Sequence, residues 1–408
     1  MAGDATAATR AGIGTVGGVD GEVVLRVERV AAGGDGLTRE PSGRVVFVPG
    51  GLPGEEVRVR IIEAKRDFAR AALVEVVAAS PGRVAPPCPH VARGCGGCSW
   101  QHVDPALQAD LKRAVVAEAL ARTGKLRDAD VRSGPALTSQ GFRTSLRLGV
   151  DRHGRPGLRG RRRHDVVAVD SCWVAHPGLV ELLELDWTGA HEVSMRVSVA
   201  TGGRTVLTDP PGAEPAALAP GVGCGAASSL VEVVEGQRLR VSAASFFQTR
   251  ADGAAALVAL VREAAGEALG AGPLVDAYGG VGLFATTLAD GPVTLVERSA
   301  SSCADARHNL DGRPATVVEA AVERWRPTPA ALVVADPARG GLGRAAAAVL
   351  AGTGAGRLVL VSCDPVSLAR DAALLADLGY RHRSSTVLDL FPHTPHVEVV
   401  SRFDRVPS

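Results

Sequence analysis

Short runs of β-branched residues, each ended by a turn signal, characterise the chain between Val23 and Val77. The turn signals are glycine-rich segments such as Gly33-Gly34-Asp35-Gly36 and Gly50-Gly51-Leu52-Pro53-Gly54. Several short strands at such close spacing predict a small β-barrel. The expected strands are Val23 to Val27, Arg44 to Val48, Glu56 to Ile62 and Ala71 to Val77.

A different pattern begins at about residue 246, where strand-like apolar runs alternate with helical stretches rich in alanine and leucine. This alternation predicts an α/β domain with a doubly wound, mostly parallel sheet. The expected strands are Leu274 to Ala277, Val293 to Glu297, Ala315 to Val318, Leu332 to Ala335 and Leu358 to Ser362.

These patterns divide the chain into four regions. Residues 1–20 lack apolar periodicity and are expected to form a disordered tail. The barrel then spans 21–80, a strand-rich central region 81–245 and the α/β domain 246–408. The central region opens with a proline-rich joint, Pro81 to Pro89, followed by an expected helix from Pro105 to Thr123.

Composition narrows the class of protein. Lysine plus arginine number 45 against 44 acidic residues, so a net charge of +1 neither predicts nor excludes an anionic partner. No uncharged apolar run reaches the length of a membrane span, so no membrane association is expected. The seven cysteines are an odd number, and no basic-then-apolar leader precedes them. We therefore expect a reducing cytoplasm rather than a secreted disulfide framework.

A glycine-rich loop follows the first strand of the α/β domain. It reads Asp276-Ala277-Tyr278-Gly279-Gly280-Val281-Gly282, and the next strand ends on Glu297, 21 positions after Asp276. Glycines let a loop turn tightly beneath a ligand, and the spaced acid can accept hydrogen bonds from both ribose hydroxyls. The loop departs from G-x-G-x-x-G, which favours S-adenosylmethionine over NAD. An ordinary strand-to-helix turn is the alternative.

Two further residues follow strands at the same expected edge. Asp336, after the fourth strand, is either a ligand contact or the N-cap of a helix. Cys363, after the fifth strand, would lie in the ligand cleft near a helix N-terminus, which favours the thiolate form. A buried, inert cysteine is the alternative for Cys363.

Five motifs, in order and spacing, resemble those of the RNA uracil-C5 methyltransferases, and the resemblance covers the chain from about Val23 to Phe403. They are Phe246-Phe247-Gln248, the loop around Tyr278, Asp336-Pro337-Ala338-Arg339, Ser362-Cys363-Asp364-Pro365, and Phe391-Pro392-His393-Thr394-Pro395-His396-Val397-Glu398.

The resemblance implies a class I, Rossmann-like methyltransferase domain and a covalent mechanism. Cys363 would add to C6 of uracil, so that C5 attacks the methyl group of S-adenosylmethionine, and Glu398 would remove the C5 proton. The family's cofactor-contact positions are occupied by Gln248, Tyr278, Glu297 and Asp336. This chain departs from many relatives at Gly279, where they have cysteine, and from some at Leu283, where they have asparagine.

Four cysteines, Cys88, Cys95, Cys98 and Cys172, supply a possible tetrathiolate site. Their spacing suits zinc or an iron-sulfur cluster. The resemblance to the family's cluster-bearing branch implies a 4Fe-4S cluster, zinc being the alternative. A structural role is expected, because methyl transfer moves no net electrons. Cys224 and Cys303 match no motif.

The region 21–80 resembles the OB-like TRAM domain, an RNA-binding barrel, although its charges cancel between Glu22 and Val77. A stronger basic segment lies in Gly141 to His164, which contains eight arginines and one acidic residue, Asp151, for a net charge of +7. Such a run can follow RNA phosphates, and a solvated turn is the alternative. Because aromatic residues are few, we expect shape and backbone contacts to dominate, with the target base flipped into the cleft of Cys363.

Together these features predict a cytoplasmic S-adenosylmethionine-dependent enzyme that methylates uridine C5 in RNA, with no obligate protein partner. Within the family that the chain resembles, the barrel and the cysteines imply 23S ribosomal RNA as the target, because the bacterial tRNA branch usually lacks both. The alternatives are a uridine in the tRNA T-loop or, from another class, a non-catalytic RNA-binding protein or chaperone.

Overall fold

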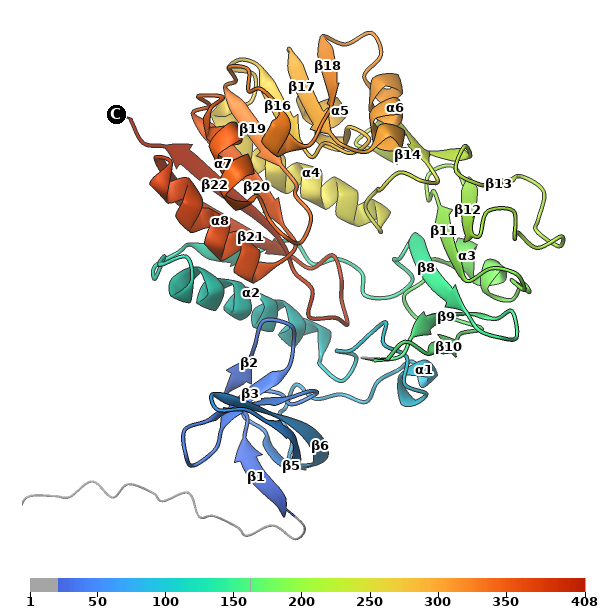
Figure 1. Ribbon diagram of the computed structural model, residues 1–408, viewed down its shortest axis with the longest axis vertical. Coiled ribbons are helices and arrows are strands. Elements are labelled where there is room, and N and C mark those ends of the chain that lie inside the picture. Colours follow the sequence, from blue (N-terminus) through green and yellow to red (C-terminus); the bar gives the residue numbers. More distant parts are fainter. Residues whose placement is uncertain (1–20, 162, 408) are drawn as a thin grey trace, which may run out of the picture. The chain divides into compact units, whose positions relative to one another are not determined.

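A six-stranded sheet of short strands makes up the first unit of the chain, which ends at Arg83. The computed structural model describes residues 21–161 and 163–407 (Figure 1), so the expected tail and Arg162 lie outside the described residues. The strand order is β1-β5-β6-β4-β3-β2, with one core that contains Val46, Val48, Val57 and Val59. The strands are β1 Glu22–Arg26, β2 Arg29–Val30, β3 Gly36–Arg39, β4 Val45–Val48, β5 Glu56–Ala64 and β6 Phe68–Ala78.

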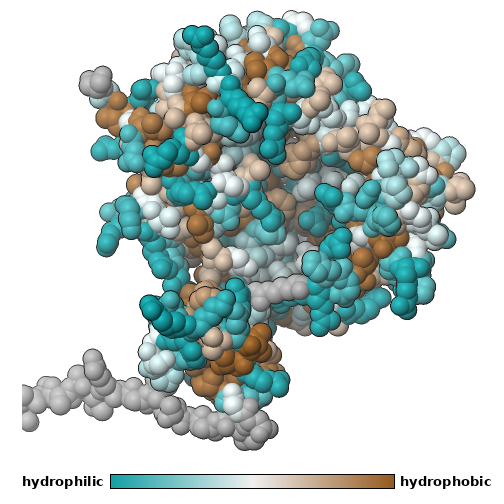
Figure 2. Space-filling view, in the orientation of Figure 1, coloured by the Kyte–Doolittle hydropathy of each residue, from teal (hydrophilic) through white to brown (hydrophobic). Residues whose placement is uncertain are grey.

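Part of this unit's outer surface is apolar. Ile62 of β5 and Val74 and Val77 of β6 are exposed, and Figure 2 shows hydrophobic surface gathered over these strands. Isolated exposed apolar residues are common in proteins and indicate no function by themselves.

The second unit, which begins at Val84, contains an eight-stranded sheet in the order β18-β17-β16-β19-β20-β22-β21-β7. The first five of these strands are parallel, as predicted, which confirms the α/β class. β22 is antiparallel to both of its neighbours. The strands are β7 Val131–Ser133, β16 Leu274–Ala277, β17 Val293–Glu297, β18 Ala315–Glu319, β19 Leu332–Ala335, β20 Arg357–Ser362, β21 Tyr380–Leu388 and β22 Glu398–Arg405.

Helices cover both faces of this sheet, because alternate strand residues are apolar on each face. In β19, Leu332 and Val334 pack in one core and Val333 and Ala335 in the other. The first core includes residues of α4 Ala251–Ala265, α5 Leu283–Leu288 and α6 Ala300–Asn309; the second includes residues of α2 Pro105–Arg122, α7 Gly343–Ala351 and α8 Pro365–Asp377. Short 3₁₀ helices span Gly266–Ala268 and Val322–Arg324.

The predicted helix at Pro105 to Thr123 is confirmed as α2, whose N-cap Asp104 accepts a hydrogen bond from the Ala106 N–H at 2.8 Å. The helix packs on α8, and β7 pairs in parallel with β21. Residues 105–133, which the sequence grouped with the central region, therefore contact the α/β sheet.

The rest of the central region forms a second sheet, β10-β9-β8-β11-β12-β13, and a hairpin of β14 and β15. Trp187, Leu148 and Met195 lie fully buried in its core. The remaining elements are α1 Pro89–Ala92, β8 Ser145–Val150, β9 Pro156–Arg159, β10 Val166–Ala168, α3 Pro177–Leu183, β11 Glu192–Val197, β12 Arg204–Asp209, β13 Val222–Cys224, β14 Ser229–Val234 and β15 Gln237–Ser242. Within 21–161 and 163–407, the helices are too short or too polar to cross a membrane.

Candidate active site at the carboxyl edge of the sheet

Backbone register brings the candidate nucleophile and base to one edge of the sheet. Ser362, the last residue of β20, pairs with Val399 of the antiparallel β22. Cys363 follows Ser362 and Glu398 precedes Val399, so the two residues occupy the next positions at the same end of adjacent strands. Asp336 follows β19, the other neighbour of β20, and its N–H donates to the Ala277 carbonyl at 3.2 Å.

The thiol of Cys363 is protonated at neutral pH in this arrangement. Burial raises its pKa to about 11, and the negative charges of Glu398 and Asp336 add to the effect, while Arg339 opposes it. The expectation that a helix N-terminus would favour the thiolate is therefore wrong for the resting site. The reason is that desolvation and two nearby carboxyls outweigh the dipole of α8.

The two carboxyls are perturbed as well. Burial raises the pKa of Asp336 to about 7. Burial, followed by the charge of Asp336, raises the pKa of Glu398 well above its usual value. Two neighbouring carboxyls resist simultaneous ionisation, so the pair retains a proton near neutral pH. The alternative that Asp336 caps a helix is wrong, because the next helix begins only at Gly343.

This raised pKa predicts a pH-dependent effect of Asp336→Asn on stability. Folding raises the pKa of the Asp336 carboxyl to about 7. Below the pKa of the unfolded state this costs no folding free energy, and the cost grows until the pH has risen through about 7. We expect the free energy of unfolding of the variant to exceed that of wild type, and the excess to be about 2 to 3 kcal/mol larger at pH 8 than at pH 5. Denaturant unfolding of the cofactor-free chain at both pH values measures this, and equal differences would contradict it.

The glycine-rich loop approaches the neighbouring strand closely. A Cβ on Gly279 would lie 2.6 Å from the Leu295 side chain, so only glycine fits beside this leucine. Glu297 closes the loop: its carboxylate accepts the N–H groups of Gly280 at 3.1 Å and of Arg298 and Ser299 at 2.8 and 2.7 Å. A carboxylate offers about four acceptor positions, so Glu297 can still accept from a ligand hydroxyl.

Asp276, from which the spacing to Glu297 is counted, lies near the other acidic residues of the site. Its Oδ2 accepts the Ala285 N–H at 2.9 Å, whereas the buried Oδ1 has no hydrogen-bond partner. Burial raises its pKa to about 7, and the charges of Asp336 and Glu297 act in the same direction. A sheet edge that gathers Asp276, Asp336 and Glu297 suits a cationic ligand and repels the pyrophosphate of NAD.

The other candidate cofactor residues differ in their surroundings. Tyr278 is half-buried in the left-handed region, with φ of 60°, and burial raises its pKa to about 12. Gln248 is half-buried in the segment before α4, and among the described residues its side chain has no hydrogen bond to the other candidates. Leu283, where some relatives have asparagine, packs in the core and points no polar atom at the loop.

Two further motif residues, Arg339 and His396, lie near the site, although the sequence assigns them no role. Arg339 lies near both Cys363 and His396, since its charge acts on each. Burial lowers the pKa of His396 to about 4, with further contributions from Arg339, Lys112 and Arg143, so its imidazole is neutral. Both residues were visible only as motif members, because their proximity depends on the fold.

The four predicted cluster cysteines are all free thiols. Burial raises the pKa of Cys98 to about 12, and Cys172, Cys95 and Cys88 add to this effect through their charges. The thiols thus lie within electrostatic reach of one another. Among the described residues, no three histidine, cysteine, aspartate or glutamate side chains are close enough together to hold one metal ion.

The segment that contains Cys88, Cys95 and Cys98, here called the cysteine segment, is hydrogen-bonded to the arginine-rich segment, Gly141 to His164. Cys95 forms an isolated β-bridge with Gly160, and the Gly96 N–H donates to the Arg159 carbonyl at 3.0 Å. A Cβ on Gly96 would lie 2.7 Å from that oxygen, which explains glycine at this position. The exposed arginines on and around β8 and β9 are Arg147, Arg152, Arg155, Arg159, Arg161 and Arg163; of these, Arg147 pairs with Glu192 and Arg155 with Asp151.

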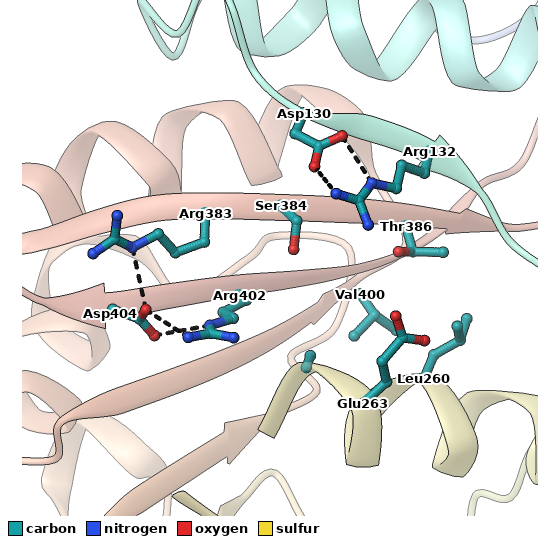
Figure 3. A pocket seen from close by; sticks show the side chains of 11 residues that line it. Asp130, Arg132, Leu260, Glu263, Arg383, Ser384, Thr386, Val400, Arg402 and Asp404 are labelled. Atoms are coloured by element: carbon teal, nitrogen blue, oxygen red, sulfur yellow. Dashed lines mark hydrogen bonds and ion pairs between the residues drawn. The ribbon is translucent and has the colours of Figure 1, made fainter. Parts of the chain in front are cut away.

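An open groove of about 480 Å³ lies elsewhere, between α4 and the strands β7, β21 and β22 (Figure 3). Its arginines are paired: Arg132 with Asp130, and Arg383 and Arg402 with Asp404. None of the predicted site residues lines it. The groove is therefore separate from the edge that carries Cys363.

Comparison with known proteins identifies a domain and the family of the chain. Residues 21–74 match the TRAM domain. The chain is 35% identical to an uncharacterized RNA methyltransferase of Streptomyces avermitilis, over 93% of this chain and 97% of that protein. It is 33% identical to the 23S rRNA (uracil(1939)-C(5))-methyltransferase of Chromohalobacter salexigens, over 92% and 87%.

Among solved structures, the chain resembles the Pyrococcus abyssi tRNA (uracil-54, C5)-methyltransferase in complex with S-adenosyl-L-homocysteine. The TM-score is 0.71 at 24% identity, covering 93% of this chain and 100% of that one, which supports the fold. The sequence relatives cover nearly the whole chain at more than 30% identity. The chain belongs to the RNA uracil-C5 methyltransferase family.

Proposed function

We propose that this RNA methyltransferase modifies C5 of a uridine through a covalent adduct with Cys363. The observation that supports this most directly is the register that sets Cys363, just after the end of β20, beside Glu398, at the start of β22. A nucleophile and a base are both required, because C5 of uracil is too weak a nucleophile to accept a methyl group unaided.

The residues of the cleft suit S-adenosylmethionine, which supplies the methyl group and carries a positive sulfonium charge. Glu297 would accept from its ribose hydroxyls, with Gln248, Tyr278 and Asp336 as further contacts. The unpartnered Oδ1 of Asp276 and the raised pKa values of the neighbouring carboxyls support a cationic occupant.

The protein's own groups then act in two steps. The Cys363 sulfur, once deprotonated, bonds to C6 of uracil, and the electron pair of the C5–C6 double bond makes C5 nucleophilic. After C5 is methylated, Glu398 takes the C5 proton, the double bond re-forms and the cysteine leaves as thiolate. A base of raised pKa suits this proton transfer, because its pKa lies nearer the working pH.

Within this proposal the target is 23S ribosomal RNA, as for the relative from Chromohalobacter salexigens. The TRAM domain and the exposed arginines near β8 and β9 would hold RNA around the flipped base. The seven free cysteines are consistent with a cytoplasmic location, which is part of the proposal.

Mass mapping of methyluridine in RNA from a deletion strain tests the target. Loss of one or more modifications from 23S ribosomal RNA is expected, and a loss confined to tRNA would transfer the assignment to the T-loop. Unchanged methyluridine in both RNAs, together with RNA binding by the purified chain, would favour the non-catalytic RNA chaperone.

The proposal includes a 4Fe-4S cluster on Cys88, Cys95, Cys98 and Cys172. The type of donor supports it: the four thiols are free and act on one another electrostatically, on segments joined through the bridge from Cys95 to Gly160. Such a cluster would fix the cysteine segment to the arginine-rich segment and supply no chemistry to methyl transfer.

Metal analysis of anaerobically purified protein tests this assignment. We expect about four iron atoms per chain and their loss in Cys98→Ser, because one missing thiolate exposes the cluster. The control Cys224→Ser, an exposed thiol on β13, should keep its iron. Stoichiometric zinc without iron would show that the site is a zinc site instead.

A further inference from the structure

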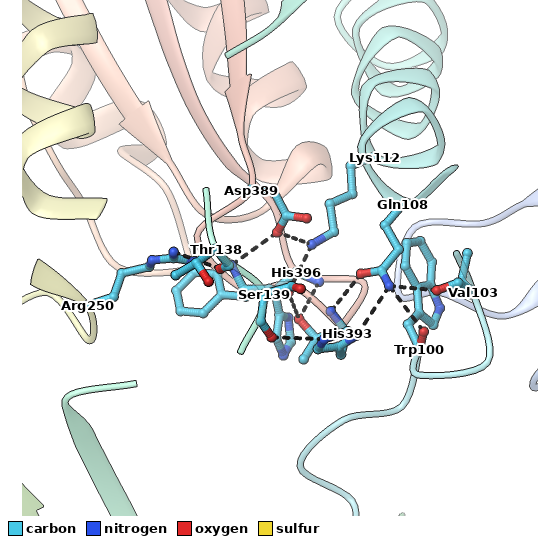
Figure 4. Close-up of polar contacts among 12 residues, drawn as sticks. Trp100, Val103, Gln108, Lys112, Thr138, Ser139, Arg250, Asp389, His393 and His396 are labelled. Carbon is cyan, nitrogen blue, oxygen red and sulfur yellow. Dashed lines mark hydrogen bonds and ion pairs between the residues drawn. The ribbon is translucent and has the colours of Figure 1, made fainter. Parts of the chain in front are cut away.

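The turn that leads into Glu398 is bound by buried polar side chains of α2. Residues 389–397, here called the base turn, connect β21 to β22, and Leu388 pairs with Glu398 at its two ends. Gln108 and Lys112 lie one helical turn apart on α2, and both are fully buried against the base turn (Figure 4). Fully buried glutamine and lysine side chains are rare unless every polar atom has a partner.

Gln108 makes contacts with both its oxygen and its nitrogen. The His393 N–H donates to Oε1 at 2.6 Å, while Nε2 donates to the Val103 carbonyl at 2.9 Å. Nε2 also lies 3.4 Å from Nδ1 of His393 and 3.4 Å from the Trp100 carbonyl. The Trp100 N–H in turn donates to the His393 carbonyl at 2.8 Å. Both backbone polar groups of His393 are therefore bound from outside its own turn.

The imidazole of His393 completes this arrangement. Its Nε2 lies 3.0 Å from the Ser139 carbonyl, which can only accept, so Nε2 carries the proton and Nδ1 accepts from Gln108. The His393 backbone has φ of 64°, a left-handed conformation that a non-glycine residue holds only when its surroundings enforce it. The contacts from Gln108, Trp100 and Ser139 supply that enforcement.

Lys112 binds the start of the base turn. Its Nζ donates to Asp389 Oδ1 at 2.6 Å and to the Phe391 carbonyl at 3.0 Å. Asp389 Oδ1 also accepts the Phe391 N–H at 3.2 Å, so the lysine binds two polar groups of the base turn and Asp389 binds a third. With His393 held by Gln108, the base turn is fixed at two points between β21 and Glu398.

We propose that Gln108 and Lys112 are positioning residues for the base, holding the base turn so that Glu398 faces the adduct formed on Cys363. This inference rests on the proposed function. Neither residue touches the reacting atoms; each acts through the backbone of the base turn. Their loss should impair the proton-abstraction half of the reaction, which needs Glu398, more than the adduct-forming half, which needs Cys363.

The test measures the two halves separately on the full chain with S-adenosylmethionine. RNA with 5-fluorouridine reports adduct formation, because fluorine cannot leave as a proton does, and ordinary uridine RNA reports complete turnover. For Gln108→Leu and Lys112→Met we expect adduct formation within about threefold of wild type and turnover reduced by roughly 10- to 100-fold. A covalent protein–RNA complex should also accumulate on ordinary RNA in denaturing gels.

Matched controls use the same substitutions away from the base turn. Gln237→Leu removes a half-buried glutamine of β15 that accepts from Arg313, and Lys125→Met removes an exposed lysine after α2. Both control variants should form the adduct and turn over at the wild-type rates. If Gln108→Leu does not fold, Gln108→Glu takes its place, because it retains the acceptor for the His393 N–H but loses the amide donors. Turnover should again fall more than adduct formation, by a smaller factor.

Equal reduction of adduct formation and turnover would overturn the inference, since that is what a purely structural role predicts. Unchanged turnover in a folded Gln108→Leu variant would overturn it too. Failure of the proposed function is distinguishable, because wild type itself would then form no adduct with 5-fluorouridine RNA.

Discussion

Cys363→Ala is expected to abolish RNA methylation, with turnover reduced by at least about 10⁴-fold. The substitution removes the sulfur that follows β20, and with it the proposed bond to C6 that makes C5 nucleophilic. Because Cys363 is half-buried and its thiol is protonated at neutral pH, alanine removes no charge from the resting fold. The free energy of unfolding should therefore change little, and the variant should still bind RNA.

The measurement is covalent capture with 5-fluorouridine RNA in the presence of cofactor. Wild type should give a protein–RNA band that survives denaturation, and Cys363→Ala should give none. Cys224→Ala, an exposed cysteine of β13, serves as the matched control and should react like wild type. An adduct of undiminished yield in Cys363→Ala would assign the nucleophile to another residue.

The raised pKa of Cys363 was not predictable from the sequence. The helix that follows the cysteine is visible in the pattern, and it favours the thiolate. The opposing effect comes from Glu398 and Asp336, which are 35 and 27 positions away and meet the thiol only because β22 and β19 flank β20. Electrostatics at a site depends on such spatial neighbours, which local sequence does not specify.

Strand positions, by contrast, follow from local apolar runs. β16, β17 and β19 begin and end where the sequence predicts, because buried parallel strands are short continuous runs of Val, Leu and Ala. The antiparallel β21 and β22 and the short β7 were not predicted. β21 is the least regular: it carries polar Arg381, His382 and Arg383, and its pairing with β22 shifts register after His382.

The base turn illustrates the same limit. The motif from Phe391 to Glu398 is visible in the sequence, but its partners Gln108 and Lys112 lie more than 270 positions earlier on α2. Helical spacing shows that these two residues share a face, and an amphipathic helix usually turns glutamine and lysine to solvent. Only the contacts of α2 with the base turn show that this polar face is buried.

Glu398→Gln should separate the two halves of the reaction more completely than any other single change. Glutamine has nearly the same shape as glutamate but cannot accept the C5 proton, so turnover should fall by about 10³-fold. It also removes a negative charge that raises the pKa of Cys363, so the thiol should ionise at least as readily as in wild type. Adduct formation should therefore proceed, and the methylated covalent intermediate should accumulate on ordinary uridine RNA.

Denaturing gels and mass spectrometry of the trapped complex identify this intermediate, which should carry the added methyl group. Glu319→Gln, at the end of β18 on the same sheet edge, is the matched control and should turn over normally. Rapid turnover by Glu398→Gln would show that another base removes the proton. If the variant binds RNA but forms no adduct, Glu398 is needed for the addition itself. It would then be the base that deprotonates the Cys363 thiol. The two substitutions together thus assign nucleophile and base independently: one should eliminate the covalent complex and the other should preserve it.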